Sequence, residues 1–354
     1  MEIDPRHLRL LLAVAEQGSF TRAAAAQRIS QPAISAGIAL LERQLGVRII
    51  ERGRHGARLN EFGELLVRHA RGLGALLGQA KAEVELKRLG YDGPLLIGGT
   101  PVTLIELVPA AIELVSRGQR PISITVAEAA DAALLEKLCT GEIEVMVSGV
   151  GQVSPPPDIA QEALLELPFD AVVSAKHAVG KRKVMSLRDL SHVQWALPTP
   201  GSAFRRHLEG MFVTAGVPFP QSYWACDSLM ALKSLVIHAD CVGVLPRNSI
   251  ALEAKAGVLR KIRLRDAAST RQIGVLTLRR RALSPLAQRF LAALRRVASG
   301  AGSRLPTSAM RIDPPHRWAT ARALQRRCRP AHSDGTGTDR PRRGPRGNDR
   351  PTGR

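Results

Sequence analysis

The stretch GSFTRAAAAQRISQPAISAGIALLERQLGVRIIER occupies residues 18–52 and predicts two short helices joined by a tight turn. Ser19 is a suitable N-cap for a first helix over about 21–27, and Ser30 is one for a second helix that Gly46 ends. Pro32 fits the first turn of the second helix, because an N–H group there has no partner inside the helix. The pattern is typical of a helix-turn-helix.

The second helix has an apolar side and a polar N-terminal end. Its apolar side is predicted to hold Ile34, Ile38, Leu41 and Leu45, which recur with helical spacing. Gln31 and Ser35 are short polar residues at the opposite, exposed end. This layout suits a recognition helix, whose first residues enter a DNA major groove while the preceding helix lies across the backbone.

Several short motifs around these helices carry a family resemblance. They are Leu8, GSFTRAA at 18–24, SQPAIS at 30–35, LE at 41–42, LG at 45–46, Arg52 and Gly63. Together they resemble the N-terminal winged helix-turn-helix of LysR-type transcriptional regulators, closely over residues 1 to about 90 and more loosely to about 298. The sequence departs from the family pattern at Ile50, at Asn60 and at the Ala36–Gly37 pair.

The resemblance and the layout of the second helix predict double-stranded DNA as a partner. Gln31 and Ser35 are expected to contact bases, as is Pro32 or Ala33 through an apolar contact, while arginines position the DNA backbone. The predicted DNA-binding residues are Thr21, Arg22, Gln31, Pro32, Ala33, Ser35, Arg43, Arg52, Arg54 and Arg58. Residues 54–60 fit a two-stranded wing, with a solvated basic turn as the alternative.

A long helix is predicted from Glu61 to about Leu89. Its apolar seam comprises Leu66, Leu73, Leu76, Leu77, Ala80 and Val84 at near coiled-coil spacing, interrupted by three glycines. In the resembled family this helix pairs with its copy in a second subunit. The resemblance therefore implies a homodimer, and we expect dimers to pair further into a homotetramer.

From Pro94 the pattern changes to short apolar strands that alternate with helices, which predicts a parallel sheet covered by helices. The resemblance implies a multidomain α/β protein: a winged helix-turn-helix, a linker helix and an effector domain of two α/β subdomains resembling periplasmic solute-binding proteins. The predicted boundaries are 1–60 for the DNA-binding domain, 61–90 for the linker, 91–166 with 268–298 for subdomain I, 167–267 for subdomain II, and 299–354 for a basic tail. The chain is expected to cross between subdomains near 164–167 and 267–271.

Ligands of open α/β sheets bind beyond the carboxyl ends of strands, where helix N-termini offer free N–H groups to anions. Thr100 is predicted to cap a helix near 103–117 with Pro101 in its first turn, and similar caps fall near Ser202 and Ser228. The predicted effector-binding residues are Thr100, Pro101, Ser148, Thr199, Gly201, Ser202 and Ser228. We expect a small organic acid or its anion as the effector, with ordinary helix caps as the alternative.

Composition agrees with a polyanionic partner. The chain of 354 residues has a net charge of +20, and Lys and Arg contacts to phosphate dominate nonspecific DNA affinity. Residues 299–354 hold 13 basic and 4 acidic residues with almost no apolar periodicity, which predicts disorder. This tail either adds nonspecific DNA affinity or has no dedicated function, and truncation at 298 would distinguish the two.

No motif for a metal, a cofactor or catalysis stands out. The four cysteines have no metal-binding spacing, and Cys139 or Cys226 is expected to pack as a small buried hydrophobe. The N-terminus lacks a signal-peptide pattern and no apolar run reaches membrane-spanning length, so a cytoplasmic location without membrane attachment is expected.

Two other classes of function stay open on the sequence. An architectural DNA-binding protein would use no effector, and its cleft would bind nothing. A solute-binding or enzymatic α/β protein with an incidental helical N-terminus would bind no DNA, although no export signal or catalytic constellation supports it.

Overall fold

The structure is a computed structural model that describes residues 3–53, 56–117, 120–151, 155–267 and 270–301. The predicted basic tail lies outside these residues from 302 onward, as do Arg54 and part of the second predicted crossing. Among the described residues, no helix is both long enough and apolar enough to pass through a membrane.

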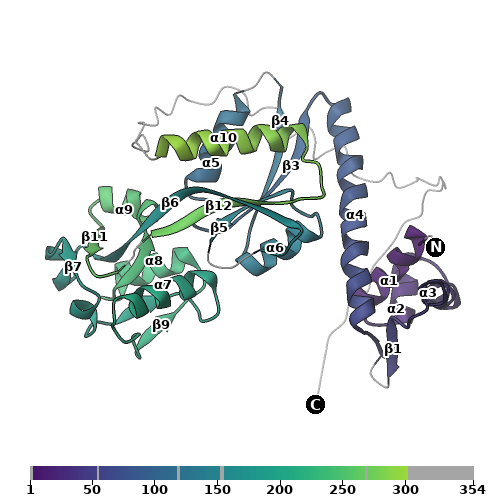
Figure 1. The fold of residues 1–354 in the computed structure, drawn as a ribbon, viewed down its shortest axis with the longest axis horizontal. Helices are drawn as coiled ribbons and strands as arrows, with labels where there is room; N and C mark the ends of the chain where they lie inside the picture. Colours follow the sequence, from purple (N-terminus) through teal and green to yellow (C-terminus); the bar gives the residue numbers. More distant parts are fainter. Residues whose placement is uncertain (1–2, 54–55, 118–119, 152–154, 268–269, 302–354) are drawn as a thin grey trace, which may run out of the picture. The chain divides into compact units, whose positions relative to one another are not determined.

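The N-terminal elements form a winged helix-turn-helix (Figure 1). They are α1 (Pro5–Gln17), α2 (Phe20–Gln27), α3 (Gln31–Leu45), β1 (Ile50–Gly53), β2 (Gly56–Leu59) and α4 (Glu61–Arg88). The predicted start and end of α3 are confirmed: the Ser30 hydroxyl accepts a hydrogen bond from Ala33 N at 3.3 Å, and Gly46 ends the helix with φ 70°. Ser19 precedes α2 as predicted, but its side chain makes no capping hydrogen bond.

The core of this part explains why a glycine lies inside α3. Ile34, Ile38 and Leu41 are buried as the spacing predicts. Gly37 lies on the same buried side, and a Cβ there would come within 2.5 Å of Leu10 Cδ1 on α1. The helix propensity lost at Gly37, about 1 kcal/mol relative to alanine, therefore permits close packing of α1 on α3.

The wing begins earlier than predicted. Its strands pair antiparallel, with Glu51 opposite Arg58, so the hairpin starts at Ile50 instead of residue 54. The Asn60 side chain caps α4: its Oδ1 accepts from Gly63 N at 3.0 Å and its Nδ2 donates to Arg48 O at 2.8 Å. The departure from the family pattern at residue 60 thus preserves the helix start and joins it to the segment that precedes the wing.

The second part is an α/β fold built on an eight-stranded sheet in the order β4-β3-β5-β12-β6-β11-β7, with β10 also paired to β6. Its strands are β3 (Asp92–Gly99), β4 (Ile122–Glu128), β5 (Val145–Gly149), β6 (Ile159–Ser174), β7 (Val184–Met185), β10 (Gly243–Pro246), β11 (Leu259–Leu264) and β12 (Thr270–Leu278). A separate parallel pair consists of β8 (Trp195–Leu197) and β9 (Tyr223–Ala225). Its α-helices are α5 (Leu107–Ser116), α6 (Asp131–Cys139), α7 (Ala203–Thr214), α8 (Leu229–His238), α9 (Ala251–Lys255) and α10 (Pro285–Ala301).

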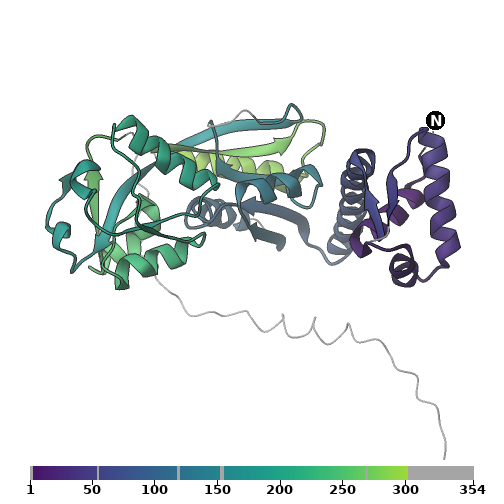
Figure 2. The same ribbon diagram turned by 90° about the horizontal axis from the view of Figure 1, so that it is seen from below.

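The prediction of a parallel sheet is only partly correct. β3 pairs parallel with β4 and β5, but β12 pairs antiparallel with both β5 and β6. The long strands β6 and β12 lie side by side in both views and connect the two ends of the sheet (Figures 1 and 2). β6 leads the chain from one end of the sheet to the other, and β11 followed by β12 leads it back along β6, so both strands pair antiparallel with β6.

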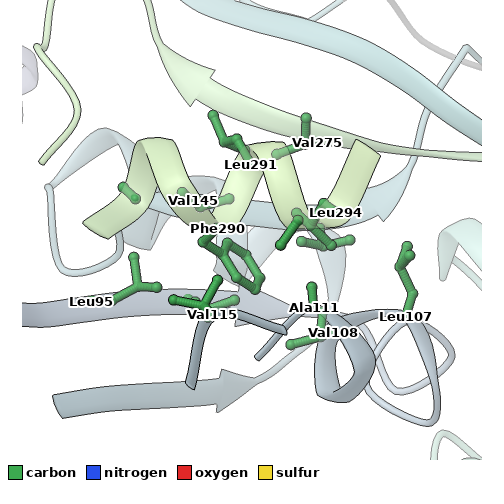
Figure 3. Close-up of a cluster of buried hydrophobic side chains, with 14 of the residues drawn as sticks. Leu95, Leu107, Val108, Ala111, Val115, Val145, Val275, Phe290, Leu291 and Leu294 are labelled. Atoms are coloured by element: carbon green, nitrogen blue, oxygen red, sulfur yellow. The ribbon is translucent and has the colours of Figure 1, made fainter. Parts of the chain in front are cut away.

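Two ends of this sheet have separate hydrophobic cores, which we call subdomains I and II. In subdomain I, Phe290 of α10 packs between Leu95 of β3 and Val108 and Val115 of α5 (Figure 3). In subdomain II, buried residues of β6 and β10 pack against α7 in one cluster and against α8 in another. The predicted crossing near 164–167 falls within β6, whereas residues 268–269 of the other crossing are not described.

One local prediction in subdomain I is wrong. Residues 101–106 form turns and α5 begins only at Leu107, so Thr100 is not the N-cap of that helix and Pro101 is not in its first turn. Thr100 instead directly follows β3: its N–H donates to Val147 O at 3.2 Å, and its carbonyl accepts from Thr103 Oγ1 at 2.9 Å. Strands β7, β9 and β11 and helix α9 were not predicted, because each is short or carries many charges.

Candidate DNA interface and ligand pocket

The N-terminal turn of α3 presents an exposed polar surface. Gln31, Pro32 and Ala33 are exposed, and Ser35 is half-buried. Gln31 Nε2 donates a hydrogen bond to Ser35 Oγ at 2.9 Å, so these two predicted base-contacting side chains lie together. The core holds the other side of α3 in place, which leaves this end of the helix free to enter a groove.

The structure describes the side chains of some, but not all, of the residues predicted to contact the DNA backbone. Thr21 and Arg22 are exposed on α2, Arg43 is exposed in the last turn of α3, and Arg58 is exposed on β2. The side chain of Arg52 and the whole of Arg54 lie outside the described positions.

Helix α4 carries large apolar side chains that the described part of the chain leaves exposed. These exposed residues are Phe62, Leu65, Leu76, Leu77, Val84 and Leu89 in and just after α4, at 42–60% exposure. Leu76, Leu77 and Val84 belong to the predicted seam. Exposed apolar side chains along one helix are typical of a protein–protein contact surface.

A cavity of about 520 Å³ lies where subdomain I meets subdomain II. Asp131 at the start of α6, Ser148 and Gly149 at the end of β5, and Arg271 on β12 line it, and Arg206 of α7 lines it from subdomain II. Its volume falls within the range of small-molecule sites.

Arg271 is the most unusual residue of this cavity, because its side chain is only 7% exposed. Its Nε has no hydrogen-bond acceptor among the described residues, and its Nη2 lies 4.0 Å from Asp131 Oδ2. Burial lowers the pKa of Arg271, the charge of Arg206 lowers it further, and the charge of Asp131 acts in the opposite direction. A buried guanidinium with an unused N–H favours an anion beside it.

Glycine at position 149 makes room for this guanidinium. A Cβ at Gly149 would overlap the Nε, Cζ and Nη2 atoms of Arg271. The neighbouring Ser148 is fully buried, and its hydroxyl donates a hydrogen bond to Asp131 Oδ1. Ser148 therefore holds the Asp131 carboxylate, while Gly149 lets the Arg271 side chain lie against the end of β5.

The cavity includes a second cation from subdomain II. Arg206 is exposed, and its Nη1 donates to Gly201 O at 2.7 Å. The predicted cap of α7 is confirmed, because Ser202 Oγ accepts from Arg205 N at 3.0 Å while donating to Thr199 O at 3.1 Å. The loop 199–202 thus positions the first turn of α7 and, through Gly201, the Arg206 side chain.

Of the predicted effector-binding residues, Ser148 lines this cavity. Thr100, Pro101, Thr199, Gly201, Ser202 and Ser228 are not among its lining residues. Thr100 is buried, and Ser228 caps α8 through a 3.3 Å hydrogen bond from Ala231 N. The effector contacts of these six residues stay predictions.

Sequence reasoning missed Arg271, although a signal was present. Arg271, Ile273 and Val275 alternate along one strand and are all buried, so the period-two pattern places Arg271 on the buried face of β12. A charged residue on such a face is rarely buried without a partner. Its neighbours Asp131 and Gly149 lie more than a hundred residues away in sequence, so spacing alone did not connect them.

The cysteines differ from the expected pattern. Cys139 is exposed and Cys226 is partly buried, whereas Cys241 is the buried one, and burial raises its pKa to about 11. Over the described ranges, no group of three or more His, Cys, Asp and Glu side chains is placed to hold a metal ion.

A winged helix-turn-helix followed by an α/β domain with a cavity between two subdomains defines a class of ligand-responsive transcription factors. Residues 5–64 match the family profile described as bacterial regulatory helix-turn-helix protein, lysR family, and residues 89–299 match the LysR substrate binding domain. The chain belongs to the LysR family of DNA-binding transcriptional regulators with an effector-binding domain. This family consists of regulators and not of enzymes.

Individual relatives agree with this assignment. The HTH-type transcriptional regulator GbpR of Azospirillum brasilense is 30% identical over 294 residues, which cover 82% of this chain and 85% of its own. The SDS degradation transcriptional activation protein of Pseudomonas sp. (strain ATCC 19151) is 30% identical over 295 residues, 80% of this chain and 93% of its own. Full-length CbnR, solved with its target DNA, has the same fold with a TM-score of 0.61 at 22% identity, over 83% of this chain and 99% of its own.

Proposed function

We propose that this regulator reads a specific DNA site through the N-terminal turn of α3 and responds to a small anion bound between its subdomains. The main support for sequence-specific DNA binding is the hydrogen-bonded pair of Gln31 and Ser35 at the N-terminus of α3, where Gln31 is exposed. An α-helix fits the major groove, and a glutamine amide donates to and accepts from base edges there. Pro32 and Ala33 add apolar contacts, and Thr21, Arg22, Arg43 and the wing arginines 52, 54 and 58 position the DNA backbone.

The exposed seam of α4 supports a homodimer as the DNA-binding unit. Leu76 and Leu77 are 52% and 54% exposed within one chain, and pairing with a second α4 would bury them. Two recognition helices related by a two-fold axis match an operator with two half-sites. Further pairing into a tetramer is part of the same proposal.

The buried Arg271 supports an anionic effector, with an organic acid as its chemical class. The unused Nε–H of Arg271 gains a charge-assisted hydrogen bond when a carboxylate enters, an interaction worth about 1.5–3 kcal/mol. Because Arg206 reaches the same cavity from subdomain II, one anion between the two arginines would connect the subdomains. The predicted contacts at Thr100, Pro101, Ser148, Thr199, Gly201, Ser202 and Ser228 belong to this proposal.

Regulation then follows from a shift between two arrangements of the subdomains. An effector that binds one arrangement more tightly favours it, and the shift is limited by that difference in affinity. The altered arrangement changes the spacing of the two recognition helices in the dimer and thereby the affinity for the operator.

Replacement of Gln31 tests the DNA-binding half of the proposal. Gln31→Ala is expected to weaken the operator complex by about 1–3 kcal/mol while leaving affinity for random DNA unchanged. Gln17→Ala, the same change at the exposed end of α1, is the matched control and should leave both affinities unaltered. Equal loss on operator and random DNA for Gln31→Ala would contradict the proposed placement of α3.

The wing is tested by a different pattern. Arg58→Ala should weaken binding to all DNA sequences similarly. It should also reduce the slope of log affinity against log salt concentration by about one, since one fewer counterion is released. Loss of sequence preference without a change in salt slope would instead assign Arg58 a base contact.

A further inference from the structure

The charges around the cavity restrict the number of negative charges that the ligand can carry. Arg206 and Arg271 contribute two positive charges, and Asp131 contributes one negative charge. The other described lining residues are uncharged. The cavity therefore carries a formal charge of +1 near neutral pH, which one carboxylate neutralises.

The carboxylate of Asp131 is held in place inside the cavity by its neighbours. Ser148, itself fully buried, donates to Asp131 Oδ1, and the other carboxylate oxygen lies 4.0 Å from Arg271 Nη2. Asp131 also lies at the first position of α6, where the helix N-terminus favours a negative side chain. Asp131 therefore offsets one of the two arginine charges, and a second carboxylate on the ligand would find no cation left to neutralise it.

The opposite end of the cavity is apolar. Met146 of β5 and Leu276 of β12 line it, and the strand register pairs these two residues directly. The same register pairs Gly149, against which the Arg271 guanidinium lies, with Ile273. Three residues along a strand separate the two ends, a distance of roughly 10 Å.

We propose that the cavity binds an amphipathic monocarboxylate, with its carboxylate at Arg271 and Arg206 and its apolar body directed along β5 toward Met146 and Leu276. Asp131 is then a specificity-determining residue that rejects dicarboxylates of the same length. This inference rests on the proposed anionic effector, and it specifies the number of negative charges and the shape of that ligand. A short alkyl chain or a single aromatic ring fits the length between the two ends.

Isothermal titration of the full-length protein with matched compounds tests this inference. Hexanoate, adipate and hexanamide share a six-carbon chain, and their end groups carry one, two and no negative charges, respectively. The compound 3-phenylpropanoate tests an aromatic body. We expect hexanoate or 3-phenylpropanoate to bind at least about tenfold more tightly than adipate and hexanamide, since one wrongly placed charge or one missing charge-assisted bond costs a factor of that order.

Asp131→Asn is the decisive variant, because an asparagine oxygen still accepts the Ser148 hydroxyl while the negative charge is gone. The preference for hexanoate over adipate should fall at least about fivefold in this variant. Asp240→Asn, the same change at a side chain that is 84% exposed, should leave the preference unchanged. Thermal unfolding of both variants verifies that the fold is retained.

The outcomes separate the inference from the proposed function. Tighter binding of adipate than of hexanoate, or an unchanged preference in Asp131→Asn, would overturn the monocarboxylate inference while an anion site remained. Binding of none of the three carboxylates, together with no binding by sulfate or phosphate, would overturn the anionic effector itself. Arg271→Gln should abolish the advantage of hexanoate over hexanamide, and its persistence would also contradict the inference.

Discussion

The ion pair between Asp170 and Arg247 in subdomain II predicts that replacing the arginine destabilises the fold more than replacing the aspartate. Asp170 on β6 is 2% exposed, and both its oxygens accept from Arg247, at 2.8 Å from Nε and 3.1 Å from Nη2. The Arg247 side chain is 45% exposed, and its hydrogen bonds to Asp170 raise its pKa. Arg247→Ala leaves a buried carboxylate without its cation, whereas Asp170→Ala leaves a guanidinium that water reaches.

The expected magnitudes follow from that difference in burial. Breaking a fully buried pair costs about 3–5 kcal/mol, and the half-exposed arginine places Arg247→Ala near the lower end, about 3 kcal/mol. Asp170→Ala loses both hydrogen bonds from the half-exposed Arg247 without leaving a buried charge, a cost of about 1.5 kcal/mol. For a domain of roughly 200 residues these values lower Tm by about 6–12 °C and about 3–6 °C, respectively.

Thermal unfolding followed by circular dichroism on the full chain measures both variants and the double variant. Removal of the orphaned carboxylate should make Arg247→Ala/Asp170→Ala more stable than Arg247→Ala alone. Equal destabilisation by the two single variants, or a double variant no more stable than Arg247→Ala, would contradict an unpaired buried charge at Asp170. Such a result would mean that water solvates Asp170 despite its burial.

Three further predictions concern packing, protonation and assembly. Gly63→Ala should destabilise the DNA-binding domain by about 1–3 kcal/mol in thermal unfolding, because its Cβ would overlap the Ile49 carbonyl, whereas Gly210→Ala, in open space on α7, should stabilise its domain by up to about 1 kcal/mol. Burial and the charge of Arg271 lower the pKa of His207 to about 4, so the unfolded chain binds a proton between pH 6.5 and 4 that the folded chain does not. Stability should therefore fall as pH drops through that window, by at most about 3 kcal/mol, and urea titrations of His207→Gln should show a weaker dependence. Leu77→Glu on the exposed seam of α4 should shift sedimentation toward monomer, and an unchanged oligomer would exclude this seam as the contact.

The helix-turn-helix was predictable because its signals are local. Ser30, Pro32 and Gly46 determine the start and end of α3 through contacts within a few residues, and the buried side of the helix follows from its spacing. The role of Gly37 was not predictable, since it depends on how closely α1 approaches. The wing was placed a few residues late, because its first strand already begins at Ile50, which pairs with Leu59.

The ligand cavity was less predictable for a physical reason. Helix caps at Ser202 and Ser228 were found from local patterns, yet the cavity depends on Asp131, Gly149 and Arg271, which three separate elements bring together. The turns at 101–106 also separated Thr100 from the helix it was expected to cap. Local sequence patterns identify caps, whereas a buried charge site requires the sheet register.

Sequence-specific DNA recognition by α3 is the central claim, and selection of bound fragments from random double-stranded DNA by the purified full-length protein tests it most directly. We expect one enriched motif with two related half-sites, and loss of that enrichment in Gln31→Ala but not in Gln17→Ala. Salt-sensitive binding without any enriched motif, or the same motif selected by Gln31→Ala, would contradict it.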